Sequence, residues 1–286
     1  MQWRGRRQSG NVVDRRRIGG RGLAIGGGIG GLGGIVVLIL YLLLGGNPSE
    51  VTQNLQGEEY SEAARSGELS AKDKEMGEFV SVVLADIEEV WHEQFQRMGE
   101  EYREPHLVLY TGQVESACGY GSAAVGPFYC PGDENVYLDL DFFEDMQREL
   151  DAPGDFALAY VIAHEVGHHV QNLLGVNEEV TAQQARMSER EANQLTVRLE
   201  LQADFLAGVW AHYARQSQDF LDSADIEEGI NAAGAVGDDR IMQQTQGYVV
   251  PDAFTHGTSE QRVRWFRKGL ETGDLSQGNT FSAARL

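Results

Sequence analysis

The feature that most constrains this chain is the sequence HEVGH at residues 164–168, which lies inside the most apolar helix predicted after residue 44. Residues 156–174 read FALAYVIAHEVGHHVQNLL, and apolar side chains would cover most faces of a helix formed by them, so we predict a buried helix. His164, Glu165 and His168 interrupt that apolar surface. Because ionisable groups are costly to bury without partners, the fold must bring polar groups or a metal ion to this helix.

The spacing of the two histidines indicates a metal site. His164 and His168 lie one helical turn apart on one face, so both imidazoles can reach one cation, with Glu165 beside it. Two histidines and a water leave a tetrahedral zinc ion one ligand short. We predict that Glu200, on a second helix, is the third ligand, and that Asp204 accepts a hydrogen bond from a ligand histidine. The alternative is a surface helix that carries the pattern by chance, with both carboxylates in solvent.

Four motifs extend this interpretation to a family. The segments HEVGHHVQNLLG, ELQADFLAGVW, GPFYCPGDENVYLDLDFF and HGTSEQRVRWF together resemble the neutral zinc metallopeptidase family (YpfJ-like), as do the opening MQWRGRRQSGNVVDRRR and the apolar stretch after it. The resemblance covers nearly the whole chain. It implies a zincin-type domain with a glutamate as third ligand, in which His164, His168 and Glu200 bind Zn²⁺ and Glu165 acts in catalysis.

The predicted function is a zinc-dependent endopeptidase that acts on peptide or protein substrates. A zinc-activated water would attack the peptide carbonyl while Glu165 takes its proton as general base. His256 is the first candidate to stabilise the oxyanion, with Arg262 and Tyr248 as alternatives, although His256 could instead make only a local hydrogen bond. The alternative functions are a non-catalytic, zinc-stabilised membrane scaffold or adaptor and an amidase acting on non-peptide bonds.

An uncharged stretch near the N-terminus predicts a membrane anchor. Residues 23–44 (LAIGGGIGGLGGIVVLILYLLL) are long enough to cross a bilayer core of about 30 Å as a helix. Residues 1–22 contain seven arginines and one aspartate, which predicts a cytoplasmic tail and an extracytoplasmic catalytic domain in a single-pass protein of the cell membrane. A cleaved signal peptide fits less well, because no A-x-A-like site follows. The Gly-x-x-x-Gly spacings of the span would permit helix pairing.

The charge balance bears on possible partners. The net charge is −21, and because residues 1–22 carry +6, the remainder carries −27. An acidic body repels phosphate backbones, so we do not expect a nucleic acid as a partner.

Two cysteines, Cys118 and Cys130, follow the predicted span. A close pair in a glycine-rich segment on the oxidising side of a membrane indicates a disulfide that closes a short loop. A metal site is the alternative, but the pair lacks the C-x-x-C spacing.

The remaining pattern predicts an α+β, mainly helical, zincin-like domain over residues 72–286, preceded by a flexible stalk at 45–71. We predict strands at residues 106–110 and 135–140 and helices at 73–98, 142–150, 189–213 and 259–270. A further helix is expected to begin with Asp225 as N-cap and Glu228 as its capping-box partner.

Overall fold

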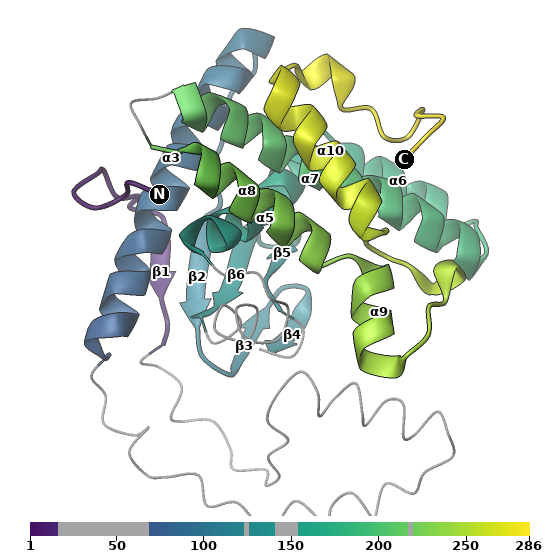
Figure 1. Ribbon diagram of the computed structural model, residues 1–286, viewed down its shortest axis with the longest axis horizontal. Coiled ribbons are helices and arrows are strands. Elements are labelled where there is room, and N and C mark those ends of the chain that lie inside the picture. The colour runs from purple at the N-terminus through teal and green to yellow at the C-terminus, as the bar shows by residue number, and fades with distance from the viewer. Residues whose placement is uncertain (17–68, 123–125, 141–153, 217–219) are drawn as a thin grey trace, which may run out of the picture.

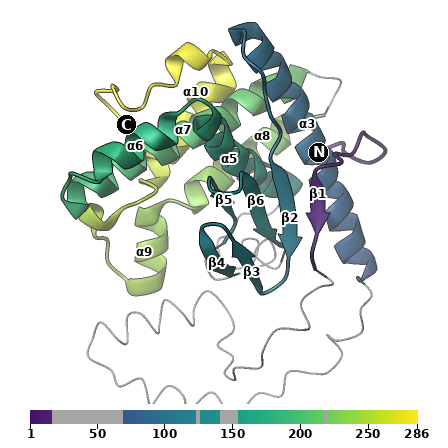
Figure 2. The same cartoon turned by 180° about the vertical axis from the view of Figure 1, so that it is seen from behind.

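A small sheet packs against a group of helices in the computed structural model, which describes residues 1–16, 69–122, 126–140, 154–216 and 220–286 (Figures 1 and 2). The strand order is β1-β2-β6-β5, with β1–β2 and β2–β6 parallel and β5–β6 antiparallel. These strands are β1 (Val12–Asp14), β2 (His106–Tyr110), β5 (Phe128–Cys130) and β6 (Asn135–Asp139). A separate hairpin pairs β3 (Gln113–Ser116) with β4 (Gly119–Ser122).

The helices make up most of the described chain. They are α3 (Ala71–Met98), α5 (Asp155–Leu173), α6 (Val176–Gln184), α7 (Glu189–Gln216), α8 (Ser223–Ala235), α9 (Asp238–Gln246) and α10 (Ser259–Thr272), with short 3-10 helices η2 (Pro251–Ala253) and η3 (Leu275–Gln277). The mainly helical architecture with small sheets is therefore as predicted, and the predicted strands and most of the predicted helices agree with it to within a few residues. The helix predicted at 142–150 lies outside the described residues.

Helix α5 lies at the centre of the domain because its sequence is apolar on nearly every side, and fifteen of its residues are buried. It packs closely on α7 where Gly167 meets Ala203: a Cβ on Gly167 would lie 3.1 Å from the Ala203 carbonyl oxygen. Helices α7 and α10 cross even more closely, since a Cβ on Gly208 would lie 2.1 Å from the carbonyl oxygen of Phe266. These close approaches hold α7 against the middle of α5 and α10 against α7.

The start of α8 differs from the prediction. Its N-cap is Asp222, three residues earlier than predicted, and Asp225 is the reciprocal capping-box residue. The pairs Asp222–Asp225 and Asp225–Glu228 both have the spacing of a capping box, and the structure forms the earlier pair. Glu228 instead accepts a hydrogen bond from the Phe156 backbone N–H at 3.2 Å, so it caps the first turn of α5.

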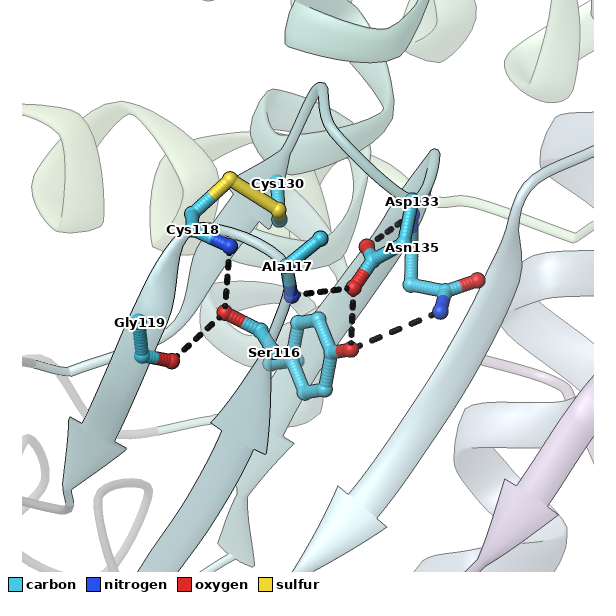
Figure 3. Close-up of a disulfide and its surroundings, with 8 residues drawn as sticks. Ser116, Ala117, Cys118, Gly119, Cys130, Asp133 and Asn135 are labelled. Carbon is cyan, nitrogen blue, oxygen red and sulfur yellow. Dashed lines mark hydrogen bonds between the residues drawn. A yellow bond between two sulfur atoms is a disulfide. The ribbon is translucent and has the colours of Figure 1, made fainter.

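The predicted disulfide is present between Cys118 and Cys130 (Figure 3). It joins the loop between β3 and β4 to the edge strand β5. Asp133 supports the same region, because it accepts hydrogen bonds from the Ala117 backbone N–H at 2.9 Å and from the Tyr137 hydroxyl at 2.8 Å. The disulfide therefore fixes the hairpin to the sheet.

The first sixteen residues pack on the domain rather than apart from it. Strand β1 pairs in parallel with β2, Val13 lying opposite Val108. Trp3 is buried and its ring meets Phe79 of α3 edge to face, with centroids 5.4 Å apart. Both views place β1 between α3 and the rest of the sheet (Figures 1 and 2).

This arrangement corrects the predicted membrane topology. Among the helices that the structure describes, none is both long enough and apolar enough to cross a membrane. The predicted span at 23–44, its glycine spacings and most of the predicted stalk lie outside the described residues. One crossing between residues 16 and 69 would put β1 and β2 on opposite sides of a bilayer, yet they are neighbours in one sheet. The predicted single-pass protein, with a cytoplasmic tail and an extracytoplasmic domain, is therefore wrong.

Candidate metal centre

Three side chains from two helices converge at the middle of the domain. His164 and His168 come from α5 and Glu200 from α7, and one ligand atom from each lies within 4.8 Å of the others. The Glu200 carboxylate lies 3.1 Å from Nε2 of His164 and 3.4 Å from Nε2 of His168. The i, i+4 spacing puts both imidazoles on one face of α5, and the close contact at Gly167 brings α7 within reach of them.

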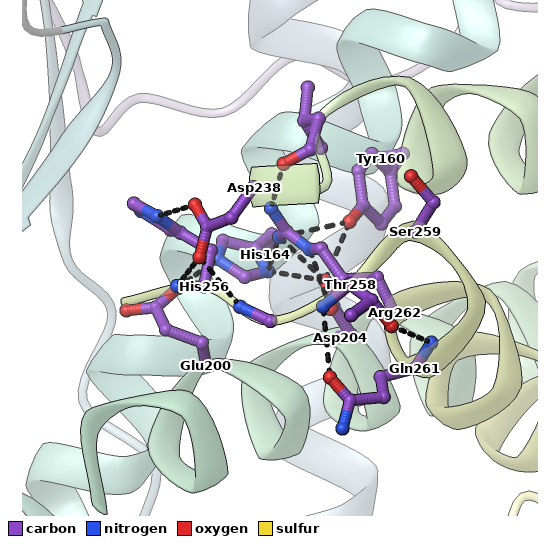
Figure 4. Close-up of polar contacts among 12 residues, drawn as sticks. Tyr160, His164, Glu200, Asp204, Asp238, His256, Thr258, Ser259, Gln261 and Arg262 are labelled. Atoms are coloured by element: carbon purple, nitrogen blue, oxygen red, sulfur yellow. Dashed lines mark hydrogen bonds and ion pairs between the residues drawn. The ribbon is translucent and has the colours of Figure 1, made fainter. Parts of the chain in front are cut away.

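The other ring nitrogen of His164 is held by a buried carboxylate. Nδ1 of His164 lies 2.8 Å from Oδ1 of Asp204, which is completely buried. Oδ1 also accepts a hydrogen bond from the Tyr160 hydroxyl at 2.6 Å. Figure 4 shows Asp204 between His164 and Arg262. This contact directs Nε2 of His164 towards Glu200.

The other ring nitrogen of His168 is held by a neutral amide. Nδ1 of His168 lies 2.8 Å from Oε1 of Gln171, which is also completely buried. The Gln171 amide nitrogen donates to the Leu199 carbonyl oxygen at 2.7 Å, so it ties α5 to α7 next to Glu200. Both imidazoles therefore present Nε2 to the same point.

The titration behaviour of the cluster fits a cation site. Burial lowers the pKa of His164, but the Asp204 carboxylate raises it more, to about 10. Burial likewise lowers the pKa of His168, and Glu200 raises it above its ordinary value. Burial raises the pKa of Glu200, but both imidazoles hold it well below its usual range. The cluster thus attracts positive charge, and two imidazole nitrogens with one carboxylate are the donor set of catalytic zinc sites.

Glu165 and His256 lie beside this cluster. Glu165 follows His164 in α5, is buried, and its carboxylate is close enough to raise the pKa of His168. His256 lies in the loop before α10, and its ring, half exposed, acts electrostatically on Glu200. Asp238 holds this loop: Oδ2 accepts the backbone N–H groups of residues 255–257 at 2.7–2.9 Å, and Oδ1 lies 3.3 Å from His256 Nδ1 (Figure 4).

With this geometry in view, comparison with known proteins decides the family. The family model described as "Putative neutral zinc metallopeptidase" matches residues 1–281. The chain belongs to this family. The match includes both helices that carry His164, His168 and Glu200.

Two relatives illustrate how far the similarity in this metallopeptidase family extends. The chain is 49% identical over 285 residues to the Escherichia coli K12 protein "Uncharacterized protein YpfJ", covering 98% of this chain and 99% of the relative. It is 47% identical over 195 residues, 65% of each chain, to the Mycobacterium tuberculosis H37Rv protein "Uncharacterized protein Rv2575". No solved structure was found to match the chain.

Two of the predicted alternatives lie apart from the ligand atoms. Arg262 is buried behind Asp204, with Nε 2.9 Å from Oδ2, so its guanidinium is committed to that carboxylate. Tyr248 is 56% exposed in the loop after α9. His169 has a structural role: its ring nitrogens contact the Tyr129 hydroxyl at 3.0 Å and the Arg103 carbonyl oxygen at 2.6 Å.

Sequence reasoning missed Gln171, Asp238 and the contacts of Arg262. Gln171 lies three residues after His168, and this i, i+3 spacing is a signal that could have identified it. Asp238 is eighteen residues from His256 and reaches it only because α9 packs beside the loop. No local pattern marks such a contact.

Proposed function

We propose that this metallopeptidase-family chain is a zinc-dependent endopeptidase that binds Zn²⁺ through His164, His168 and Glu200. One observation carries the proposal: Nε2 of each imidazole approaches the Glu200 carboxylate while each Nδ1 is already occupied by Asp204 or Gln171. An imidazole with its Nδ1 so engaged offers Nε2 as a metal ligand. Three protein ligands leave a fourth position for water or substrate, as in catalytic zinc sites.

Glu165 is proposed as the general base. When bound, zinc would polarise the substrate carbonyl and lower the pKa of a coordinated water to about 7. Glu165 lies next to His164 in α5, and a carboxylate in this place can accept the proton of the attacking water and pass it to the leaving amine.

His256 is proposed to donate a hydrogen bond to the developing oxyanion. Asp238 holds the loop of His256. Burial raises the pKa of Asp238, but its contacts with His256 and Gly257 lower it more, so this pKa lies below its ordinary value. An ionised Asp238 therefore faces the loop and can fix the orientation of the imidazole. A preorganised donor of this kind stabilises charge that develops in the transition state.

The test is a Glu165→Gln variant of the full chain, assayed for zinc content and for cleavage of a library of unstructured peptides. We expect one zinc per chain in both proteins and a loss of cleavage of about 10²–10⁴-fold in the variant. Glu179→Gln, on the exposed face of α6, is the matched control and should leave both quantities unchanged. Unchanged cleavage by Glu165→Gln would contradict the role of this residue. A zinc-loaded wild type that cleaves no peptide would favour a non-catalytic scaffold.

A further inference from the structure

Arg262 is a buried cation that contacts both Asp204 and the end of α8. It comes from the first turn of α10, is 4% exposed, and makes hydrogen bonds with both oxygens of Asp204, with Tyr160 and with the Val236 carbonyl oxygen. A guanidinium holds its donors in one rigid plane, so fixing one contact fixes the directions of the others. This geometry goes beyond what neutralising one buried carboxylate requires.

On one side, Arg262 fixes the partner of a metal ligand. Its Nε and Nη2 lie 2.9 Å from Oδ2 and Oδ1 of Asp204, a two-pronged contact that prevents the carboxylate from rotating. Oδ1 faces Nδ1 of His164 at 2.8 Å. Rotation of the carboxylate would release the imidazole, so the guanidinium controls the direction of His164 Nε2 through Asp204.

On the other side, Arg262 holds the junction between α8 and α9. Its Nη1 donates to the carbonyl oxygen of Val236, the C-cap of α8, at 3.1 Å. Two residues further on is Asp238, which binds the loop of His256. Gly237 lies against α10, where a Cβ would be 2.3 Å from the Ser259 backbone nitrogen, so the junction packs directly on the start of α10.

We infer that Arg262 is a positioning residue that couples the metal ligand His164 to His256, by fixing Asp204 and the α8–α9 junction with one guanidinium. Arg262 thereby sets the place of His164 and His256 relative to each other, and Figure 4 shows all three side chains. The catalytic meaning of this coupling rests on the proposed function, whereas the coupling itself is a property of the fold.

The experiment uses Arg262→Lys in the full chain, because lysine keeps the charge and loses the planar fork. Zinc affinity is measured by competition with a chelator, and hydrogen exchange is measured at the backbone N–H groups of residues 255–257, which Asp238 binds. We expect the dissociation constant for zinc to rise about 10–100-fold. We also expect exchange at 255–257 to accelerate by about tenfold, while exchange in the buried part of α5 stays unchanged.

Two further variants separate the two contacts. Asp238→Asn should accelerate exchange at 255–257 and leave zinc affinity within about twofold, because Asp238 does not touch a ligand histidine of the predicted zinc site. Arg264→Lys is the matched control on the same helix, where the arginine pairs with Glu260 at a partly exposed site, and it should change neither quantity.

Zinc affinity and exchange both within about twofold of wild type in Arg262→Lys would overturn the inference, and so would a change in zinc affinity alone. If Arg262→Lys fails to fold, Arg262→Gln replaces it, since a shorter side chain with one amide cannot hold Asp204 and the Val236 carbonyl oxygen together. No change in either measurement in that variant overturns the inference equally. Neither measurement requires cleavage, so a chain that shows both shifts and cleaves nothing keeps the coupling and loses the peptidase.

Discussion

The two flanks of the candidate metal centre hold equivalent histidines in different ways. On the first flank, Nδ1 of His164 faces Asp204, a carboxylate that is buried with the counter-ion Arg262. On the second flank, one helical turn away, Nδ1 of His168 faces the neutral amide of Gln171. Asp204 and Gln171 are both completely buried, so depth in the protein does not explain the choice.

The difference lies in what each flank needs to be stable. A buried carboxylate requires a counter-charge, and Arg262 holds the pKa of Asp204 below its ordinary value against the effect of burial. A buried amide needs only its hydrogen bonds, and Gln171 also donates to the Leu199 carbonyl oxygen and to Gln202. The charged flank should therefore be the more costly one to break.

The largest expected effect is that of Asp204→Asn. This change leaves the Arg262 guanidinium buried without its carboxylate, so we expect about 3–5 kcal/mol less stability towards unfolding. Zinc should bind about 10–100-fold more weakly, because His164 loses its charged partner. Urea unfolding and chelator competition measure the two effects. A loss of stability below about 1 kcal/mol would show that the ion pair is not what distinguishes this flank.

The pH dependence of zinc affinity sharpens the same comparison. Because Asp204 raises the pKa of His164 to about 10, the imidazole is protonated at neutral pH without metal, and zinc must displace that proton. Affinity should therefore rise with pH and fall by at least about tenfold for each pH unit on acidification, because the raised pKa of His168 adds a second competing proton. The slope should be shallower in Asp204→Asn and unchanged in a variant of Gln171. Equal slopes in all three proteins would remove the proposed difference between the flanks.

A smaller effect is expected on the neutral flank from Gln171→Met. Methionine has similar length but cannot accept from His168 or donate to the Leu199 carbonyl oxygen, so we expect a loss of about 1–3 kcal/mol in stability. Zinc affinity should fall about tenfold, towards the lower end of the range for such partners. Gln183→Met, on the exposed face of α6, is the control. A loss greater than that in Asp204→Asn would reverse the ranking of the flanks.

The smallest effect concerns a partly buried carboxylate outside the site. Asp86 accepts a hydrogen bond from the Trp210 indole at 2.8 Å, and burial raises its pKa to about 6. A raised pKa means that the folded state favours the protonated form, so this residue loses stabilising effect as pH rises from about 4 through 6. Asp86→Asn should thus stabilise the protein by about 1–2 kcal/mol at pH 8 and by little at pH 4. Thermal unfolding at the two pH values, with Glu93→Gln as an exposed control, measures this. Destabilisation by Asp86→Asn at pH 8 would show that the ionised Asp86 carboxylate stabilises the fold, as the carboxylate of Asp204 is expected to do.

Much of the fold was predictable from the sequence where the signal was local. The short apolar run HLVLY located β2, and alternation of apolar residues located β6. A segment that is apolar on most sides located α5, and the helical pattern located α3, α7 and α10. The short strand β1 escaped notice, because three residues in an arginine-rich segment carry no periodic signal and form a strand only by pairing with β2. The membrane topology failed for the same reason: it treated the first residues as separate from the domain.

The sequence by itself determined which residues could act together along one helix. The i, i+4 spacing of His164 and His168 and the i, i+3 spacing of His168 and Gln171 follow from 3.6 residues per turn, whatever surrounds the helix. The sequence also predicted that Glu200 would meet those imidazoles from a second helix, but only the tertiary structure decided how: Glu200 comes within reach by the close packing of α7 on Gly167, and Arg262 by the crossing of α10 over α7. Spacing along a chain encodes the geometry of its own helix, whereas contacts between helices depend on how their side chains pack.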